Sequence, residues 1–153
     1  MNTNNSNEHA SEVLNDLLKI NNDRINGYKK AETETTEADL KKLFRDMENE
    51  SEKLASTLTR EVAKLGGKPD IDSTTNSGKI YRVWMDVKAT FSGKDRKSVL
   101  EACEFGEDAA QKAYKTALND EDLPADLKTL IKLQQTQLKL AHDTIKSLRD
   151  RAN

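Results

Sequence analysis

The chain has 153 residues, a length that fits one domain with a hydrophobic core of its own. Charged residues make up 34% of it and apolar residues 35%, a balance typical of long helices with exposed faces. The net charge of −2 gives no general reason to bind nucleic acid or an anionic membrane, and the single cysteine cannot form an internal disulfide, so we expect a cytoplasmic protein with neither kind of partner.

The chain is expected to start with a disordered segment, followed by a long helix. Residues 1–10 are polar and rich in Asn and Ser, which predicts disorder and is unlike a signal peptide. The helix is expected from about residue 11 to about Glu34. Its apolar residues recur at helical spacing: Leu14, Leu17, Leu18, Ile25, Tyr28 and Ala31.

A second helix is expected to begin near Thr36 or Asp39, either of which can cap its first turn. It carries the clearest apolar stripe of the chain: Leu40, Leu43, Phe44, Met47, Leu54, Leu58, Val62 and Leu65. Gly66 then stands where a left-handed C-cap is common, and Pro69 prevents the helix from continuing. These signals predict that the helix ends near residue 66.

The stretch between residues 66 and 97 is expected to hold a loop and a short fifth helix. The segment "KIYRVWMDVKATF" spaces Ile80, Trp84, Val87 and Phe91 along one face of an amphipathic helix. At about 1.5 Å per helical residue or 3.3 Å per extended residue, the stretch is long enough to cross a helical bundle from end to end. Ile80, Trp84 and Phe91 are the candidate interface of a homodimer.

Two more long helices are expected in the last third of the chain. Ser98 is a candidate cap for the first of them, whose inner face carries Leu100, Cys103, Ala110, Tyr114 and Ala117. Pro124 suits the first turn of the other, which has a near-heptad line of Leu127, Ile131, Gln134, Leu138, Ala141, Ile145 and Leu148. The sequence has no alternating strand pattern, so it predicts an all-α fold of two antiparallel hairpins joined by a long crossover.

Each long helix also places a polar side chain on or near its apolar face: Asn21, Glu50, Glu107, Gln134 and His142. At about 100° per residue, His142 lies about 60° from the heptad line of its helix. A buried polar group costs a few kcal/mol unless it is hydrogen-bonded. These five side chains are therefore predicted to meet in an inner polar cluster, in which His142 donates to Glu107 or Glu50.

The order of hairpin, long crossover and hairpin resembles that of ferritin-like four-helix bundles. The phrases "EVAKLGGKP", "VWMDVKATFSGKD", "VLEACEFGEDAAQKAY" and "AHDTIKSLRD" more closely resemble a bacterial family of such bundles, catalogued as a domain of unknown function and often described as stress-associated. The resemblance covers roughly residues 11–150 and implies a single ferritin-like domain there. It implies a fold but no settled activity.

The resemblance also indicates where a dimetal site would lie. Ferritin-like sites take one Glu from each of two helices and Glu-x-x-His from each of the other two. The six corresponding places in this chain hold Asn21, Glu50, Lys53, Glu107, Lys139 and His142. The charges of these residues sum to zero, and an ammonium within about 4 Å of a monovalent cation is repelled by on the order of 4 kcal/mol at an effective dielectric constant near 20. A dimetal centre is therefore not expected.

Three hypotheses on function remain. The first is a non-enzymatic, stress-associated bundle that binds a partner or associates with itself, with no cofactor and with a degraded dimetal site. The second is a redox or storage protein of ferritin type that holds one iron, manganese or zinc ion through Glu50, Glu107 and His142, a donor set of two carboxylates and one imidazole. The third is a partner-binding module whose apolar groove opens when the crossover helix moves.

Overall fold

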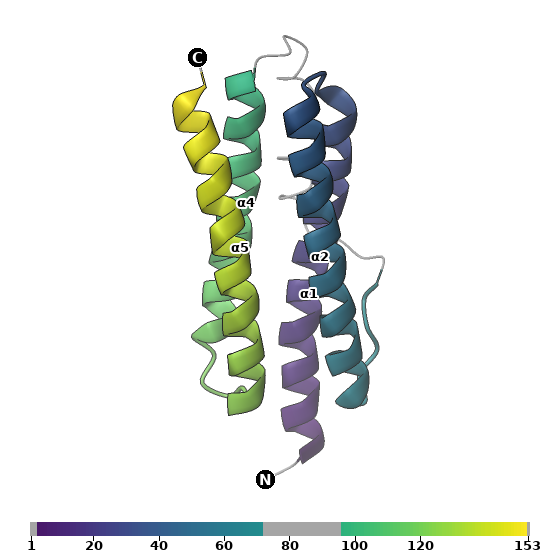
Figure 1. The fold of residues 1–153 in the computed structure, drawn as a ribbon. Coiled ribbons are helices and arrows are strands. Elements are labelled where there is room, and N and C mark those ends of the chain that lie inside the picture. Colours follow the sequence, from purple (N-terminus) through teal and green to yellow (C-terminus); the bar gives the residue numbers. More distant parts are fainter. Residues whose placement is uncertain (1–2, 72–95, 153) are drawn as a thin grey trace.

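The described part of the chain, residues 3–71 and 96–152 of this computed structural model, is entirely helical in its regular structure. Four long helices lie side by side: α1 (Thr3–Glu34), α2 (Ala38–Lys64), α4 (Arg96–Leu118) and α5 (Ala125–Arg151) (Figure 1). The prediction of an all-α fold is confirmed for these residues. None of the described helices is long and apolar enough to cross a membrane.

Two apolar clusters show in which direction each helix runs. One cluster contains Leu14 near the start of α1 and Leu127 near the start of α5, together with residues from the ends of α2 and α4. The other contains Tyr28 near the end of α1 and Ile145 near the end of α5, together with residues from the starts of α2 and α4. The pairs α1–α2 and α4–α5 are therefore antiparallel, and α2 and α4 run in the same direction (Figure 1).

The chain between α2 and α4 holds the predicted fifth helix and the candidate interface residues Ile80, Trp84 and Phe91. These lie outside the described residues, so both remain predictions.

The first helix begins at Thr3, inside the segment for which the sequence predicted disorder. Ala10 and Leu14 are fully buried. His9 Nε2 also lies 2.7 Å from Asp120 Oδ2 in the α4–α5 connection. This contact joins the first turns of α1 to a segment that is distant in sequence, and the local composition does not reveal it.

The end of α2 follows the predicted stop signal. Gly66 has a φ of 82°, the left-handed conformation that glycine adopts without strain. Its N–H donates to the Ala63 carbonyl and that of Gly67 to the Val62 carbonyl, both at 3.0 Å, as in a Schellman motif. At the other end of α2, the predicted caps are wrong: Glu37 is the N-cap residue and makes no side-chain capping bond.

Candidate functional site

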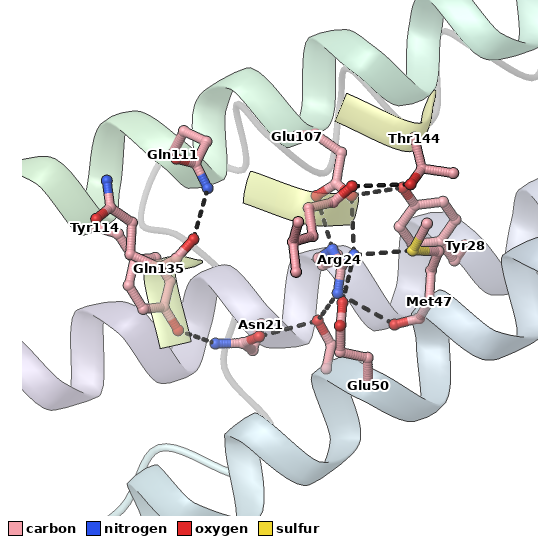
Figure 2. Close-up of polar contacts among 12 residues, drawn as sticks. Asn21, Arg24, Tyr28, Met47, Glu50, Glu107, Gln111, Tyr114, Gln135 and Thr144 are labelled. Atoms are coloured by element: carbon pink, nitrogen blue, oxygen red, sulfur yellow. Dashed lines mark hydrogen bonds and ion pairs between the residues drawn. The ribbon is translucent and has the colours of Figure 1, made fainter. Parts of the chain in front are cut away.

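A buried arginine from α1 lies in the interior of the bundle. Arg24 is 2% exposed, and its Nε and Nη2 donate to Oε1 and Oε2 of Glu107 on α4 at 2.8 and 2.9 Å. Glu107 is itself 1% exposed. Nη2 of Arg24 also lies 3.1 Å from Oε1 of Glu50 on α2, a contact in ion-pair range without hydrogen-bond geometry (Figure 2). One guanidinium therefore joins three helices.

Neighbouring groups use the remaining donors of this guanidinium. Nη1 of Arg24 donates to the Met47 carbonyl at 3.2 Å and to Ser51 Oγ at 2.7 Å. Tyr28 donates its hydroxyl to Glu107 Oε2 at 2.9 Å, and its ring centroid lies 5.1 Å from the guanidinium carbon, within cation–π range. Every nitrogen of the guanidinium therefore donates to an acceptor, and both oxygens of Glu107 accept hydrogen bonds.

A second set of hydrogen bonds extends from Ser51 to all four helices. Ser51 donates to Asn21 Oδ1, and Asn21 Nδ2 donates to the Tyr114 hydroxyl, both at 2.9 Å. Tyr114 then donates to Gln134 Oε1 at 2.7 Å. Because Ser51 also accepts from Arg24, the two sets form one central network: Asn21, Arg24, Tyr28, Glu50, Ser51, Glu107, Tyr114 and Gln134.

The network keeps its arginine charged and its phenol protonated. Burial lowers the pKa of Arg24, but the carboxylate of Glu107 outweighs burial and raises that pKa above its ordinary value. Burial raises the pKa of Tyr28 well above its usual range, and Glu107 adds to the increase. Burial also raises the pKa of Glu50, against the opposing effect of Arg24. The shifts of Arg24 and Tyr28 thus favour the charged guanidinium and the protonated phenol that their hydrogen bonds to Glu107 require.

Four of the five residues predicted to form the inner polar cluster belong to the central network, and one does not. Asn21, Glu50, Glu107 and Gln134 lie in it. His142 instead lies between α5 and α4, with Nε2 against Asp108 Oδ1 and Nδ1 3.1 Å from Asp143 Oδ1. The prediction that His142 donates to Glu107 or Glu50 is therefore wrong. The offset of about 60° from the heptad line of α5 turns the ring toward the flank of the bundle.

The environment of His142 is that of a surface ion-pair group. Burial lowers the pKa of His142, but hydrogen bonds to Asp143 and Asp108 outweigh it and raise that pKa above its usual value. Lys139 also pairs with Asp143 at 2.9 Å, and Lys53 is exposed. Both lysines at the places of the ferritin-like ligands therefore lie toward solvent.

The geometry does not bring the three candidate metal ligands together. Among the residues that the structure describes, only His9, Asp120 and Asp122 form a set of three such side chains whose donor atoms all lie within 4.8 Å of one another. The carboxylates of Glu50 and Glu107 approach the same guanidinium, while His142 pairs elsewhere.

Sequence reasoning missed Arg24, Tyr28, Ser51 and Tyr114 as members of the central network. The sequence does contain a signal for Arg24, because this residue follows Asn21 by three positions and precedes Tyr28 by four. This spacing places all three on one helical face. A positive charge within an apolar stripe should have been matched with the inward-facing Glu50 and Glu107.

Comparison with known proteins adds a family but no activity. Residues 9–120 match the model of a family described as Domain of unknown function (DUF2383). The match includes α2 and α4 and most of α1, and with them Arg24, Glu50 and Glu107. No curated protein matches the chain.

Proposed function

The chain belongs to this DUF2383 family, and we propose that it is a non-enzymatic, ferritin-like bundle protein of the cytoplasm in which a buried arginine stands in place of a dimetal site. The observation that carries the proposal is the guanidinium of Arg24, 2% exposed and held by two hydrogen bonds to Glu107. Such a protein acts by binding or self-association, the role that its resemblance to stress-associated bundles also suggests.

The helix directions support the ferritin-like part of the proposal. The hairpin α1–α2 is followed by the hairpin α4–α5, and α2 and α4 run in the same direction (Figure 1). This order is the one that a long crossover produces.

The charges around Arg24 support the absence of an inner metal centre. A divalent ion within about 4 Å of the guanidinium would be repelled by on the order of 8 kcal/mol at an effective dielectric constant near 20. The same ion would compete with Arg24 for Glu107, whose two oxygens already accept from the guanidinium. The interior is thus better suited to hold the helices in register than to bind metal.

Oxidation of iron(II) in aerated buffer tests this proposal against a redox or storage protein of ferritin type. We expect the same rate with and without the protein, and no change in Glu50→Gln or Glu107→Gln. A rate above background that is lost in either variant, but kept when exposed Glu121 becomes Gln, would contradict the proposal. Circular dichroism of each variant checks that it is folded.

The outer face of α5 supports self-association. Its residues Thr129, Leu133, Thr136, Leu140 and Thr144 are all exposed and uncharged, in a chain whose residues are 34% charged. Leu133 and Leu140 are 59% and 66% exposed. The three threonine hydroxyls donate to carbonyls one turn earlier, at 3.1, 3.0 and 2.9 Å, so their methyl groups remain for packing.

The spacing along this outer face favours a second copy of the chain as the partner. Four of these five positions are symmetric about the point between residues 136 and 137, and Thr136 lies beside that point. In an antiparallel contact of two α5 helices, Leu133 of each copy therefore lies opposite Leu140 of the other, and Thr129 lies opposite Thr144. A two-fold interface requires this self-complementarity.

Sedimentation equilibrium at high protein concentration tests the dimer. We expect Leu140→Glu to shift the chain to monomer, because the symmetric contact would bury two like charges near two leucines. Phe105→Glu is the matched control, since Phe105 is 60% exposed on α4 and lies outside this face. The same dimer fraction in Leu140→Glu as in the wild type would exclude α5 as the interface.

A further inference from the structure

A histidine from α1 and two aspartates from the α4–α5 connection meet at one end of the bundle. Nε2 of His9 lies 2.7 Å from Oδ2 of Asp120, although 111 positions separate the two residues in sequence. Asp122 completes a set whose donor atoms all lie within 4.8 Å of one another. His9 precedes Arg24 by about 22 Å along α1, so the set is separate from the central network.

We propose that His9, Asp120 and Asp122 bind one divalent transition-metal ion of the zinc type. One imidazole nitrogen and two carboxylate oxygens are a donor set that such ions accept, and a fourth position remains for water. Calcium and magnesium prefer oxygen ligands alone, so the imidazole selects against them.

The local geometry leaves the required atoms available. Oδ1 of Asp120 accepts the Asp122 N–H at 2.9 Å, which fixes the Asp120 carboxylate and leaves Oδ2 to face His9. Zinc bonds of about 2.0–2.2 Å place tetrahedral donors roughly 3.3–3.6 Å apart. In the structure, His9 Nε2 and Asp120 Oδ2 lie 2.7 Å apart, and all donor atoms of the set lie within 4.8 Å of one another. Small side-chain rotations would bring these distances into the zinc range. Asp122 is exposed and is free to rotate toward the ion.

The surroundings of the three residues favour a cation with an open position. His9 and Asp120 also line a cavity of about 380 Å³, which Glu12 and Asp16 border as well. Burial raises the pKa of Asp16, and the negative charge of Glu12 adds to that increase while Lys19 opposes it. Four carboxylates gather here, those of Glu12, Asp16, Asp120 and Asp122, and Lys19 and Lys128 are the lysines that act on Asp16 and Asp120. The cavity gives room for the water that would complete the coordination.

A hydrogen bond between His9 and Asp120, without any metal, is the simpler explanation of this contact. The role of Asp122 distinguishes that explanation from a metal site. The hydrogen bond does not require the Asp122 carboxylate, whereas a metal site with three ligands does. Asp122→Asn keeps the backbone N–H that fixes Asp120. Glu121→Gln is the matched control, because Glu121 is an exposed neighbouring acid and the variant makes the same change in charge.

Isothermal titration of the chelator-treated full chain with Zn²⁺ is the test. We expect one equivalent to bind the wild type and Glu121→Gln equally, and to bind Asp122→Asn and His9→Gln at least tenfold more weakly. Zn²⁺ should also raise the melting temperature of the wild type more than that of Asp122→Asn. Glu107→Gln should bind Zn²⁺ as the wild type does, which separates this site from the interior of the bundle.

Two results would overturn the proposal. One is the absence of wild-type binding at millimolar Zn²⁺. The other is an equal affinity of Asp122→Asn and the wild type for Zn²⁺, which would leave His9 and Asp120 as a hydrogen-bonded pair only.

Discussion

Replacing Arg24 with methionine is expected to lower the free energy of unfolding by about 3–5 kcal/mol, because it leaves a buried carboxylate without its partner. Glu107 is 1% exposed and would keep only the hydroxyl of Tyr28 among its observed hydrogen-bond donors. Methionine retains much of the side-chain volume, so the loss reports charge and hydrogen bonding more than packing. Urea unfolding of the variant and the wild type measures the difference.

An exposed arginine supplies the control for this prediction. Arg45 pairs with Glu32 at 2.7 Å but is 66% exposed, so Arg45→Met is expected to change stability by less than about 1 kcal/mol. The double variant Arg24→Met with Glu107→Met removes both buried charges. It should be more stable than Arg24→Met alone. If the two losses simply add, the unpaired carboxylate is not the cause.

The helices themselves were largely predictable because their signals are local. The apolar stripe of α2, the glycine at position 66 and the end of α1 at Glu34 each follow from a few neighbouring residues. The start of α1 was not predictable in this way. His9 contacts Asp120, which is distant in sequence, and the local composition around His9 indicates only a polar segment.

The central network was predicted only in part, and the errors follow from the ligand places of ferritin-like sites. Asn21 and Glu107 were expected inside because they interrupt apolar stripes, and both are 0–1% exposed. The six ligand places of a ferritin-like site do not include the position of Arg24. Arg24, one turn after Asn21, is hydrogen-bonded to Glu107 and lies in ion-pair range of Glu50, two residues at those places. His142 was predicted to lie in the interior, although its offset of about 60° from the heptad line indicates the flank of the bundle.

The hydrogen bonds of Asn21 are expected to act as a unit with those of its neighbours. Asn21→Leu keeps the size of the side chain but removes the acceptor of Ser51 and the donor to Tyr114, so we expect a loss of about 1–3 kcal/mol in urea unfolding. Exposed Asn119→Leu should change stability by less than about 0.5 kcal/mol.

A double-mutant cycle of Asn21→Leu with Tyr114→Phe distinguishes a connected network from independent bonds. Tyr114 accepts from Asn21 and donates to Gln134, so each single change removes the same Asn21–Tyr114 bond. The double variant should therefore lose less than the sum of the single losses, with a coupling of about 0.5–3 kcal/mol. Additive losses would mean that Tyr114 and Asn21 contribute separately. In that case the hydrogen bond between Asn21 and Tyr114 would not couple the contacts of Arg24 to Gln134 on α5.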